Sequence, residues 1–297
     1  MASNTKEIKR RIKSITNIGQ ITKAMELVSA AKMRKAQVTA VASRPYAVLS
    51  NELLRNLAAS ANLTNHPLIN RVILLGKQAA PKKVLIILIS SDRGLAGAFN
   101  TNLVNKALSI VKQEGAERID FVTTGKKGTD AILRMHYNIV ANFPGKDKNI
   151  TGLDAEPIAV MAMDDFLAGK YEKVFVVYTD FISTLVQRPN MMQILPFSSQ
   201  VAGDGLHKTE KTEFLFEPSS DEILEILIQR TVKFMVYQAL VEGAASEHSA
   251  RMVAMRNANE AAGDLLQELS LSYNQARQAG ITRELSEISA AKLAMEG

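Results

Sequence analysis

The C-terminal part of the chain contains no proline over residues 219 to 297, and this feature restricts its fold most. Ser219 and Glu222 have the spacing of a capping box, which satisfies backbone N–H groups at the start of a helix. A single helix over this range would be roughly 110 Å long, several times an ordinary domain helix. We therefore expect it to pack against a second helix rather than inside a compact domain. Its apolar residues recur as on one helix face: Ile223, Leu227, Val232, Met235, Leu240, Met252, Met255, Leu265, Leu269, Tyr273, Ile281, Leu285 and Ile288.

The N-terminus provides a candidate partner for this helix. Apolar residues recur there in steps of three or four, which places them on one face: Ile8, Ile12, Ile15, Ile18, Ile21, Met25 and Val28. Pro45 is expected to bend or interrupt the helix, and the apolar pattern resumes from Val48 to Leu57. Two helices at opposite ends of one chain, joined by a globular middle, most simply form an antiparallel coiled coil. The longer C-terminal helix would then have a tip that stands alone.

Composition excludes several classes of protein. No apolar run approaches the ~18 residues that a transmembrane helix needs. The chain has no cysteine, and therefore no disulfide framework, thiolate metal site or redox switch. Basic residues begin at Lys6 and an amphipathic pattern follows, so we expect no signal peptide. These features indicate a cytosolic location, which includes the cytoplasmic face of a membrane.

Positive charge is concentrated near the N-terminus. The whole chain has a net charge of +6, and residues 1 to 37 hold nine basic and two acidic side chains. Such a helix could bind nucleic acid, anionic lipid or an acidic protein, or could simply present a solvated face. The lack of any aromatic residue before Tyr46 disfavours nucleic acid, and the lack of Trp and Phe on the apolar face of this helix disfavours lipid insertion. An acidic protein partner remains the functional interpretation.

The middle of the chain alternates strands and helices. This alternation predicts a central Rossmann-like α/β domain with a mostly parallel sheet, in which the last two strands are antiparallel. We expect connections at 60–80, 142–156 and 203–217, and the domain division 1–60, 80–200 and 218–297. The expected strands are 82–91, 119–123, 173–181 and 187–196, and the expected helices are 101–113, 128–136 and 157–167.

Two glycine-containing turns resemble nucleotide-binding loops only superficially. Gly94 and Gly97 follow a strand but lack the G-x-G-x-x-G spacing, and residues 125–129 (GKKGT) carry Walker-like letters in the wrong order. We interpret both as turn glycines. The four histidines are scattered, and no nucleophile motif is present. The sequence therefore predicts no catalytic residue, no cofactor site and no metal site.

Motifs in three parts of the chain carry a specific resemblance. They occur in order and span nearly the whole chain: residues 8–15 (IKRRIKSI), 20–28 (QITKAMELV) and 30–34 (AAKMR); residues 91–95 (SDRGL) and 99–102 (FNTN); residues 245–255 (ASEHSARMVAM) and 281–288 (ITRELSEI). On these motifs the chain resembles the gamma subunit of F-type ATP synthase, in its bacterial form.

The resemblance implies a rotating shaft that couples ion flow to ATP synthesis or hydrolysis and performs no bond chemistry itself. Its implied partners are the alpha and beta subunits, the epsilon subunit and the ring of c subunits. It implies no cofactor, no nucleic acid and no direct lipid insertion, and a peripheral position on the cytoplasmic face of the bacterial cell membrane. The α/β fold and the basic helix also leave two other interpretations open, a nucleotide-binding enzyme and a nucleic-acid-binding coiled coil.

The resemblance also assigns contact residues. Met25 matches the position where the shaft passes an acidic lever of beta, with Lys9, Arg10 and Arg11 nearby. A second set matches polar positions that catch loops of the surrounding head: Arg251, Gln278, Thr282 and Glu284. One departure from the family pattern is residues 289–292 (SAAK), where members often have Gly-Gly or Ser-Gly. The contacts of the last turn are therefore not carried over.

Overall fold

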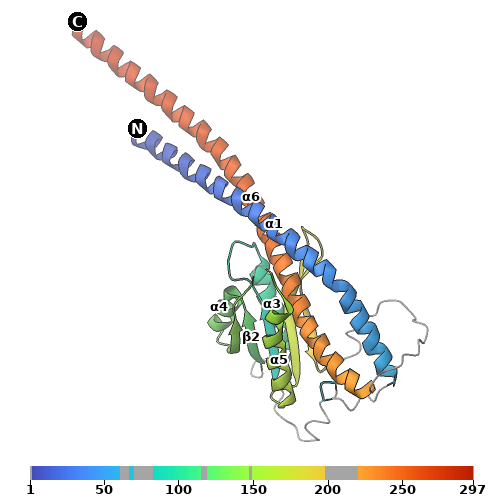
Figure 1. The fold of residues 1–297 in the computed structure, drawn as a ribbon. Helices are drawn as coiled ribbons and strands as arrows, with labels where there is room; N and C mark the ends of the chain where they lie inside the picture. Colours follow the sequence, from blue (N-terminus) through green and yellow to red (C-terminus); the bar gives the residue numbers. More distant parts are fainter. Residues whose placement is uncertain are drawn as a thin grey trace. The chain divides into compact units, whose positions relative to one another are not determined.

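The computed structural model describes residues 2–60, 67–69, 83–114, 119–146, 149–197 and 220–296. The two chain ends are long helices, α1 (Ala2–Ser60) and α6 (Ser220–Glu296), coloured blue and orange to red in Figure 1. They confirm the predicted terminal helices. The chain divides into two compact units, which we call the helical unit (Met1–Ser29 with Arg251–Gly297) and the α/β unit (Ala30–Ala250). The predicted connections 60–80 and 203–217 lie largely outside the described residues.

Pro45 does not interrupt α1, because the helix continues to Ser60. Proline removes one backbone hydrogen bond from a helix, a cost that tertiary contacts can offset. Two contacts to α6 flank this position. The hydroxyl of Ser43 lies 2.5 Å from Oε1 of Gln238, and the rings of Tyr46 and Phe234 have centroids 4.6 Å apart. Packing against α6 thus accounts for a continuous helix where the sequence alone predicted a break or bend.

The α/β unit contains one five-stranded sheet in the order β3-β2-β1-β4-β5. The first four strands are parallel and β5 is antiparallel to β4, which confirms the predicted mostly parallel sheet with an antiparallel last pair, but β3 was not among the predicted strands. The elements along the chain are β1 (Val84–Ile89), α3 (Phe99–Glu114), β2 (Ile119–Thr124), α4 (Lys126–Arg134), β3 (Asn138–Phe143), α5 (Gly152–Leu167), β4 (Lys173–Phe181) and β5 (Gln187–Leu195).

The predicted connection at 142–156 is wrong at both of its ends. Edge strand β3 extends to Phe143, and alternate residues on it are half-buried, as expected for a strand with one covered face. Helix α5 begins at Gly152 rather than at Pro157, and Thr151 and Asp154 form a capping box at its start. Pro157 therefore lies inside the helix instead of opening it.

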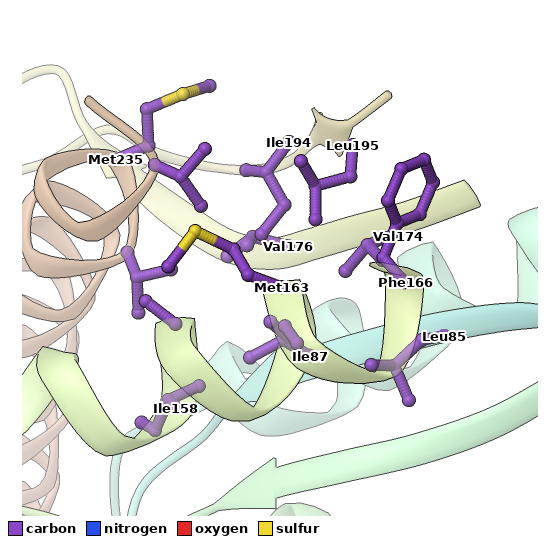
Figure 2. Packing of buried hydrophobic residues seen from close by; sticks show 14 of the residues in the cluster. Leu85, Ile87, Ile158, Met163, Phe166, Val174, Val176, Ile194, Leu195 and Met235 are labelled. Atoms are coloured by element: carbon purple, nitrogen blue, oxygen red, sulfur yellow. The ribbon is translucent and has the colours of Figure 1, made fainter. Parts of the chain in front are cut away.

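Two apolar clusters lie on opposite faces of the sheet. One joins the sheet to α3 and α4 through residues such as Leu103, Phe121 and Ile132. The other joins it to α5 and to α6, and Figure 2 shows Ile158, Met163 and Phe166 of α5 against side chains of β1, β4 and β5, with Met235 of α6 beside them. The α/β unit thus has three layers, with helices covering both faces.

The second cluster corrects one expectation about α6. Its members on this helix, including Ile228, Val232, Val236 and Ala239, belong to the core of the α/β unit and are fully buried. The inner part of α6 therefore does bury its apolar side within a compact domain. From Val241 to Ser249 nearly every residue is buried. This segment lies against the sheet, since a Cβ atom on Gly243 would be 3.1 Å from Ile89 and the Ser246 hydroxyl donates a hydrogen bond to the backbone oxygen of Thr179.

Candidate functional site

In the helical unit, the covered positions of α1 follow a strict seven-residue repeat. Apart from Met25, every residue from Thr5 to Ser29 that is at least half-buried falls in alternating steps of three and four. This spacing is the signature of a left-handed coiled-coil seam. The seam residues on α1 are Thr5, Ile8, Ile12, Ile15, Gly19, Thr22, Glu26 and Ser29.

Helix α6 carries the matching seam. A series with the same steps runs through its covered positions from Met252 to Gly280: Met252, Met255, Asn259, Ala262, Leu266, Leu269, Tyr273, Ala276 and Gly280. A Cβ atom placed on Gly19 would lie 3.7 Å from Oδ1 of Asn259 and 3.8 Å from Cβ of Ala262. Within this unit the two chain ends lie at the same end, so the pair is antiparallel (Figure 1).

The seam follows the predicted apolar stripe of α1 only through Ile8, Ile12 and Ile15. Ile18, Ile21 and Val28 were expected on the packed face, but they are largely exposed, with 59% of Ile21 open to solvent. The seam instead uses small residues such as Thr22 and Ser29, which let two helices approach closely. With the half-buried Met25, the three exposed residues form a second stripe on α1, which we call the outer stripe (Ile18, Ile21, Met25 and Val28).

The C-terminal end of α6 also has exposed apolar side chains, like the outer stripe of α1. Among the described residues beyond Gly280, every one is exposed, so this part of α6 has no covering element within the described chain. Ile281, Leu285 and Ile288 recur at helical spacing on this tip, and Ile288 is 66% exposed. They were predicted as part of the packed stripe, as was Leu265, which is also exposed. The expectation of a tip that stands alone is met, but its apolar residues do not join the seam.

The basic residues assigned by resemblance lie on the surface of α1. Lys9, Arg10 and Arg11 are exposed, and Nη2 of Arg11 lies 2.6 Å from Oε1 of Glu7 one turn earlier. An exposed pair of this kind contributes little to stability. These side chains are therefore available to a partner without loss to the fold.

The second set of assigned residues falls in two separate places on α6. Gln278 and Thr282 lie one turn apart near the exposed C-terminal end of α6, where the Thr282 hydroxyl donates a hydrogen bond to the backbone oxygen of Gln278 at 3.0 Å. Glu284 is also exposed but lies two residues beyond Thr282, on a different side of the helix. Arg251 is 7% exposed and lies about 40 Å from Gln278 along the helix, at 1.5 Å per residue. The structure therefore places two of the four residues on one face and leaves Glu284 and Arg251 apart from them.

In the α/β unit, the turn before α4 explains why its glycines are not a phosphate cradle. A helix start offers free N–H groups to an anion, but here the chain itself accepts them. Asp92 Oδ1 accepts from the N–H of Lys126 at 3.0 Å, the backbone oxygen of Ser91 accepts from Lys127 at 2.9 Å, and Ser90 Oγ accepts from Gly128 at 2.8 Å. The Asp92 carboxylate thus occupies the place that an anion would take.

The same turn requires its glycines for close packing. Gly125 has a φ of 84°, and a Cβ atom there would lie 2.2 Å from the backbone oxygen of Ser90. A Cβ atom on Gly128 would lie 2.5 Å from Ser90 Oγ. The SDRGL motif and the GKKGT turn are therefore two halves of one packed junction between β1 and α4.

In the described part of the chain, no cluster of three or more His, Asp or Glu side chains is arranged to hold a metal ion. No helix there is long and apolar enough to cross a membrane.

Comparison with known proteins gives a consistent result. A family described as ATP synthase matches residues 4–295. The chain is 40% identical over 291 residues to an ATP synthase gamma chain of Pelotomaculum thermopropionicum, covering 98% of this chain and 99% of that one. It is also 40% identical over 300 residues to an ATP synthase gamma chain of Chloroflexus aurantiacus, with coverage of 98% and 99%.

Solved structures share the fold. A chain from the F1 and c-ring part of the Euglena gracilis mitochondrial ATP synthase superposes with a TM-score of 0.68 at 19% sequence identity. The superposition covers 99% of this chain and 95% of that chain. The architecture of two terminal helices and a central sheet is therefore shared along almost the whole length.

Proposed function

Since this chain belongs to the family of ATP synthase gamma chains, we propose that it is the central rotor shaft of an F-type ATP synthase. By rotation it would couple ion flow through the membrane ring to ATP synthesis or hydrolysis at the beta subunits. Its partners would be the alpha and beta subunits of the catalytic head, the epsilon subunit and the c-subunit ring. The chain supplies mechanical coupling, and the bond chemistry takes place on beta.

The observation that carries this proposal is the outer stripe of α1. Ile18, Ile21 and Val28 are large aliphatic residues that remain exposed although the coiled-coil seam beside them is complete. Fully burying an exposed aliphatic side chain is worth roughly 1.5–3 kcal/mol, and because these side chains are already about half covered, a partner surface would gain about half of that from each. The exposed Ile281, Leu285 and Ile288 on the tip of α6 support the same interpretation. A ring of alpha and beta subunits around the helical unit is the partner that fits both.

Rotary coupling follows from symmetry. Two helices of different sequence present a different surface in every direction, whereas the three beta subunits of a ring are equivalent. At any angle the pair therefore contacts three identical subunits unequally and stabilises a different conformation in each. Turning the pair exchanges these roles, and in reverse a change of beta conformation turns the pair.

Within this function we propose roles for the residues assigned by resemblance. Met25 would meet the acidic lever of beta, and the exposed Lys9, Arg10 and Arg11 would attract its carboxylates as the pair turns. The remaining four would catch loops of the head: Arg251, Gln278, Thr282 and Glu284. The Thr282 hydroxyl already donates a hydrogen bond to the backbone oxygen of Gln278, so it would have to give up this hydrogen bond to donate one to a loop of the head.

The proposal extends to domains and location. We propose that 1–60 and 218–297 act as the shaft and that 80–200 is the part that meets epsilon and the c-ring. The whole would lie peripherally on the cytoplasmic face of the bacterial cell membrane. A nucleotide-binding enzyme is disfavoured, because Asp92, Ser91 and Ser90 already accept hydrogen bonds from the N–H groups that would hold a phosphate.

A rotation assay tests the proposal directly. The chain has no cysteine, so Leu133→Cys, at an exposed position on α4, gives a single attachment point for a bead. After assembly with alpha and beta subunits immobilised on a surface, we expect ATP to drive the bead in one direction. An assembled head that hydrolyses ATP while the bead stays still would contradict the rotor function.

A pair of matched variants tests whether the outer stripe of α1 contacts the head. The double change Ile18→Ser and Ile21→Ser should lower ATP-driven proton pumping severalfold, because it removes apolar contact with the head. The double change Val38→Ser and Val41→Ser removes two exposed aliphatic side chains from the part of α1 that belongs to the α/β unit, and should leave pumping unchanged. Equal effects of the two changes would show that the outer stripe has no special role.

A further inference from the structure

A groove of about 410 Å³ on the α/β unit is lined by residues of α1, α5 and α6. Its lining combines three aromatic rings with three charged side chains and a glycine. Ligand sites in proteins commonly have volumes of roughly 300–1,000 Å³, with aromatic walls and a few polar groups that orient the ligand. None of the lining residues is among the rotor contacts proposed above, so the rotor function leaves this groove unexplained.

The aromatic rings form the apolar part of the groove. Phe234 of α6 contacts two tyrosines, with its ring centroid 4.6 Å from that of Tyr46 and 6.0 Å from that of Tyr237. The two pairs of ring planes are tilted by 51° and 48°, so the rings do not cover one another face to face. Tyr46 remains 45% exposed in spite of this contact. A planar aromatic ligand can therefore stack on these rings or meet them edge to face.

The charged side chains give the groove a net positive charge. Nζ of Lys233 lies 2.6 Å from Oε1 of Glu156, and the charges of this ion pair cancel. The third charged residue, Arg230, is exposed and forms no ion pair with another described residue. A guanidinium stays protonated in proteins and can donate two parallel hydrogen bonds to one carboxylate. The groove therefore favours an anion over a neutral molecule or a cation.

The volume indicates the size of the ligand. An apolar cavity of about 150 Å³ is large enough to hold benzene. The groove is more than twice as large, and has room for two fused aromatic rings and a short acidic substituent.

We propose that this groove binds a small planar aromatic carboxylate. Its rings lie against Tyr46, Phe234 and Tyr237, and its carboxylate accepts hydrogen bonds from Arg230. A bound molecule contacts α1 through Tyr46 and α6 through the other residues, so occupancy strengthens the contact between these helices within the α/β unit. The site does not depend on the rotor function, because every step of binding can be measured on the full chain alone.

Three indole probes of similar size and different charge test the site: indole-3-acetate, indole-3-acetamide and tryptamine. The chain has no Trp, so indole fluorescence reports the probe without a protein background. Titrations up to about 5 mM cover the weak affinities expected of molecules this small. We expect indole-3-acetate to bind about tenfold more tightly than the neutral amide, because charge-assisted hydrogen bonds are the stronger ones. Tryptamine should bind most weakly.

Ionic strength gives a second readout with the same probes. The preference for indole-3-acetate over the amide should shrink as salt is raised, because Arg230 is exposed and its charge is screened. No binding of indole-3-acetate, or equally tight binding of tryptamine, overturns the proposal.

A charge variant and its control locate the carboxylate. Arg230→Gln should remove the preference for indole-3-acetate and leave binding of the amide within about twofold, since only the charge-assisted hydrogen bonds are lost. Arg34→Gln removes an exposed arginine of α1 in the same unit that does not line the groove, and should have no effect. Equal loss of the preference in both variants overturns the proposal.

Two further variants locate the rings of the probe. Phe234→Leu removes the ring that contacts both tyrosines and should weaken all three probes about fivefold, the usual worth of an aromatic pair. A Cβ atom added at Gly152 meets nothing within 4 Å, so Gly152→Leu should be tolerated by the fold and should narrow the groove. Undiminished binding in both variants overturns the proposal.

A measurement on the unchanged chain covers the case in which a variant does not fold. Nuclear Overhauser contacts from the indole protons of bound indole-3-acetate should appear at the ring protons of Tyr46, Phe234 and Tyr237. Contacts only at side chains outside the groove would show that the carboxylate binds elsewhere and would overturn the assignment.

Discussion

At the scale of single residues, Asp92 shows how this fold differs from its nucleotide-binding counterparts. Parallel α/β sheets often place the N-terminus of a helix against the phosphate of a ligand. Here the carboxylate of Asp92 accepts the N–H of Lys126 at the start of α4 and sits where the helix dipole favours negative charge. Gly145 packs against the other side of this carboxylate, since a Cβ atom there would lie 2.9 Å from it. The carboxylate of Asp92 thus takes the position at the helix N-terminus that the phosphate of a bound nucleotide takes in other α/β proteins.

Replacing Asp92 should therefore cost stability rather than a ligand. We expect Asp92→Ala to lower the free energy of unfolding by about 0.5–2 kcal/mol, the usual effect of removing a helix cap. Asp92→Asn keeps an oxygen for the N–H of Lys126 and should retain most of the stability. Urea unfolding of the three chains measures both effects. If alanine and asparagine were equally destabilising, the cap would not be the reason for the loss.

At the scale of secondary-structure elements, α1 has two stripes of residues with different roles: the seam packs against α6, and the outer stripe remains exposed. Its seam towards α6 combines isoleucines with small residues, and the aliphatic side chains of the outer stripe point away from the seam. Small seam residues bring the helices close, as at Gly19, which faces Asn259 and Ala262. The element can therefore hold its partner helix and still present apolar surface to a third body.

Gly19 gives a test of how tight the seam is. A methyl group at this position would meet only ordinary van der Waals contacts, and alanine favours helix over glycine by about 0.8–1.0 kcal/mol. We expect Gly19→Ala to raise the unfolding midpoint of the helical unit in a circular dichroism melt. Gly19→Leu should lower it, because its longer side chain would collide with Ala262. A destabilising alanine would mean that the helices approach more closely than the structure shows.

Periodicity predicted the helices and most strands because it reports which side of an element is apolar. It located α6, β1 and β4 within a few residues. It failed to show that Ile18 and Ile21 lie outside the seam, because two apolar stripes on one helix look alike until the partner is known. The seven-residue repeat through Ile8, Ile15, Thr22 and Ser29 was the signal available, and its small polar members concealed it.

The remaining misses have similar physical causes. The short alternation of β3 was weak because an edge strand buries only one side. Thr151 and Asp154 have the spacing of a capping box, whereas the helix was expected to begin at Pro157. The burial of Ile228 and Val232 in the α/β unit depends on contacts between segments far apart in the sequence. No local pattern records such contacts. The assigned contact residues came from resemblance alone, and periodicity gave no independent support for Arg251 or Gln278.

At the scale of the whole molecule, α1 and α6 each contribute residues to both units, so a force on one unit can be carried by two continuous helices. Such a chain works as a shaft only if no angle of rotation is held too strongly. Met25 lies at the edge of the seam and within the outer stripe, and is half-buried. It has no acidic residue three or four positions away on α1. A cation placed there would find no partner on its own helix and would be free to meet carboxylates on beta.

We therefore predict that Met25→Lys uncouples the assembled synthase. A new ion pair with the acidic lever would add about 1–3 kcal/mol to one angle of rotation, and leaving that angle would become slower. ATP hydrolysis should continue while proton pumping and ATP synthesis fall disproportionately. The defect should grow as ionic strength falls, because screening of the added pair decreases. Leu27→Lys is the matched control, since it adds the same charge two residues later on a different side of α1, at a site that is 60% exposed. An equal loss of coupling in both variants, or a ratio of pumping to hydrolysis that Met25→Lys leaves unchanged at every salt concentration, would remove Met25 from the proposed contact.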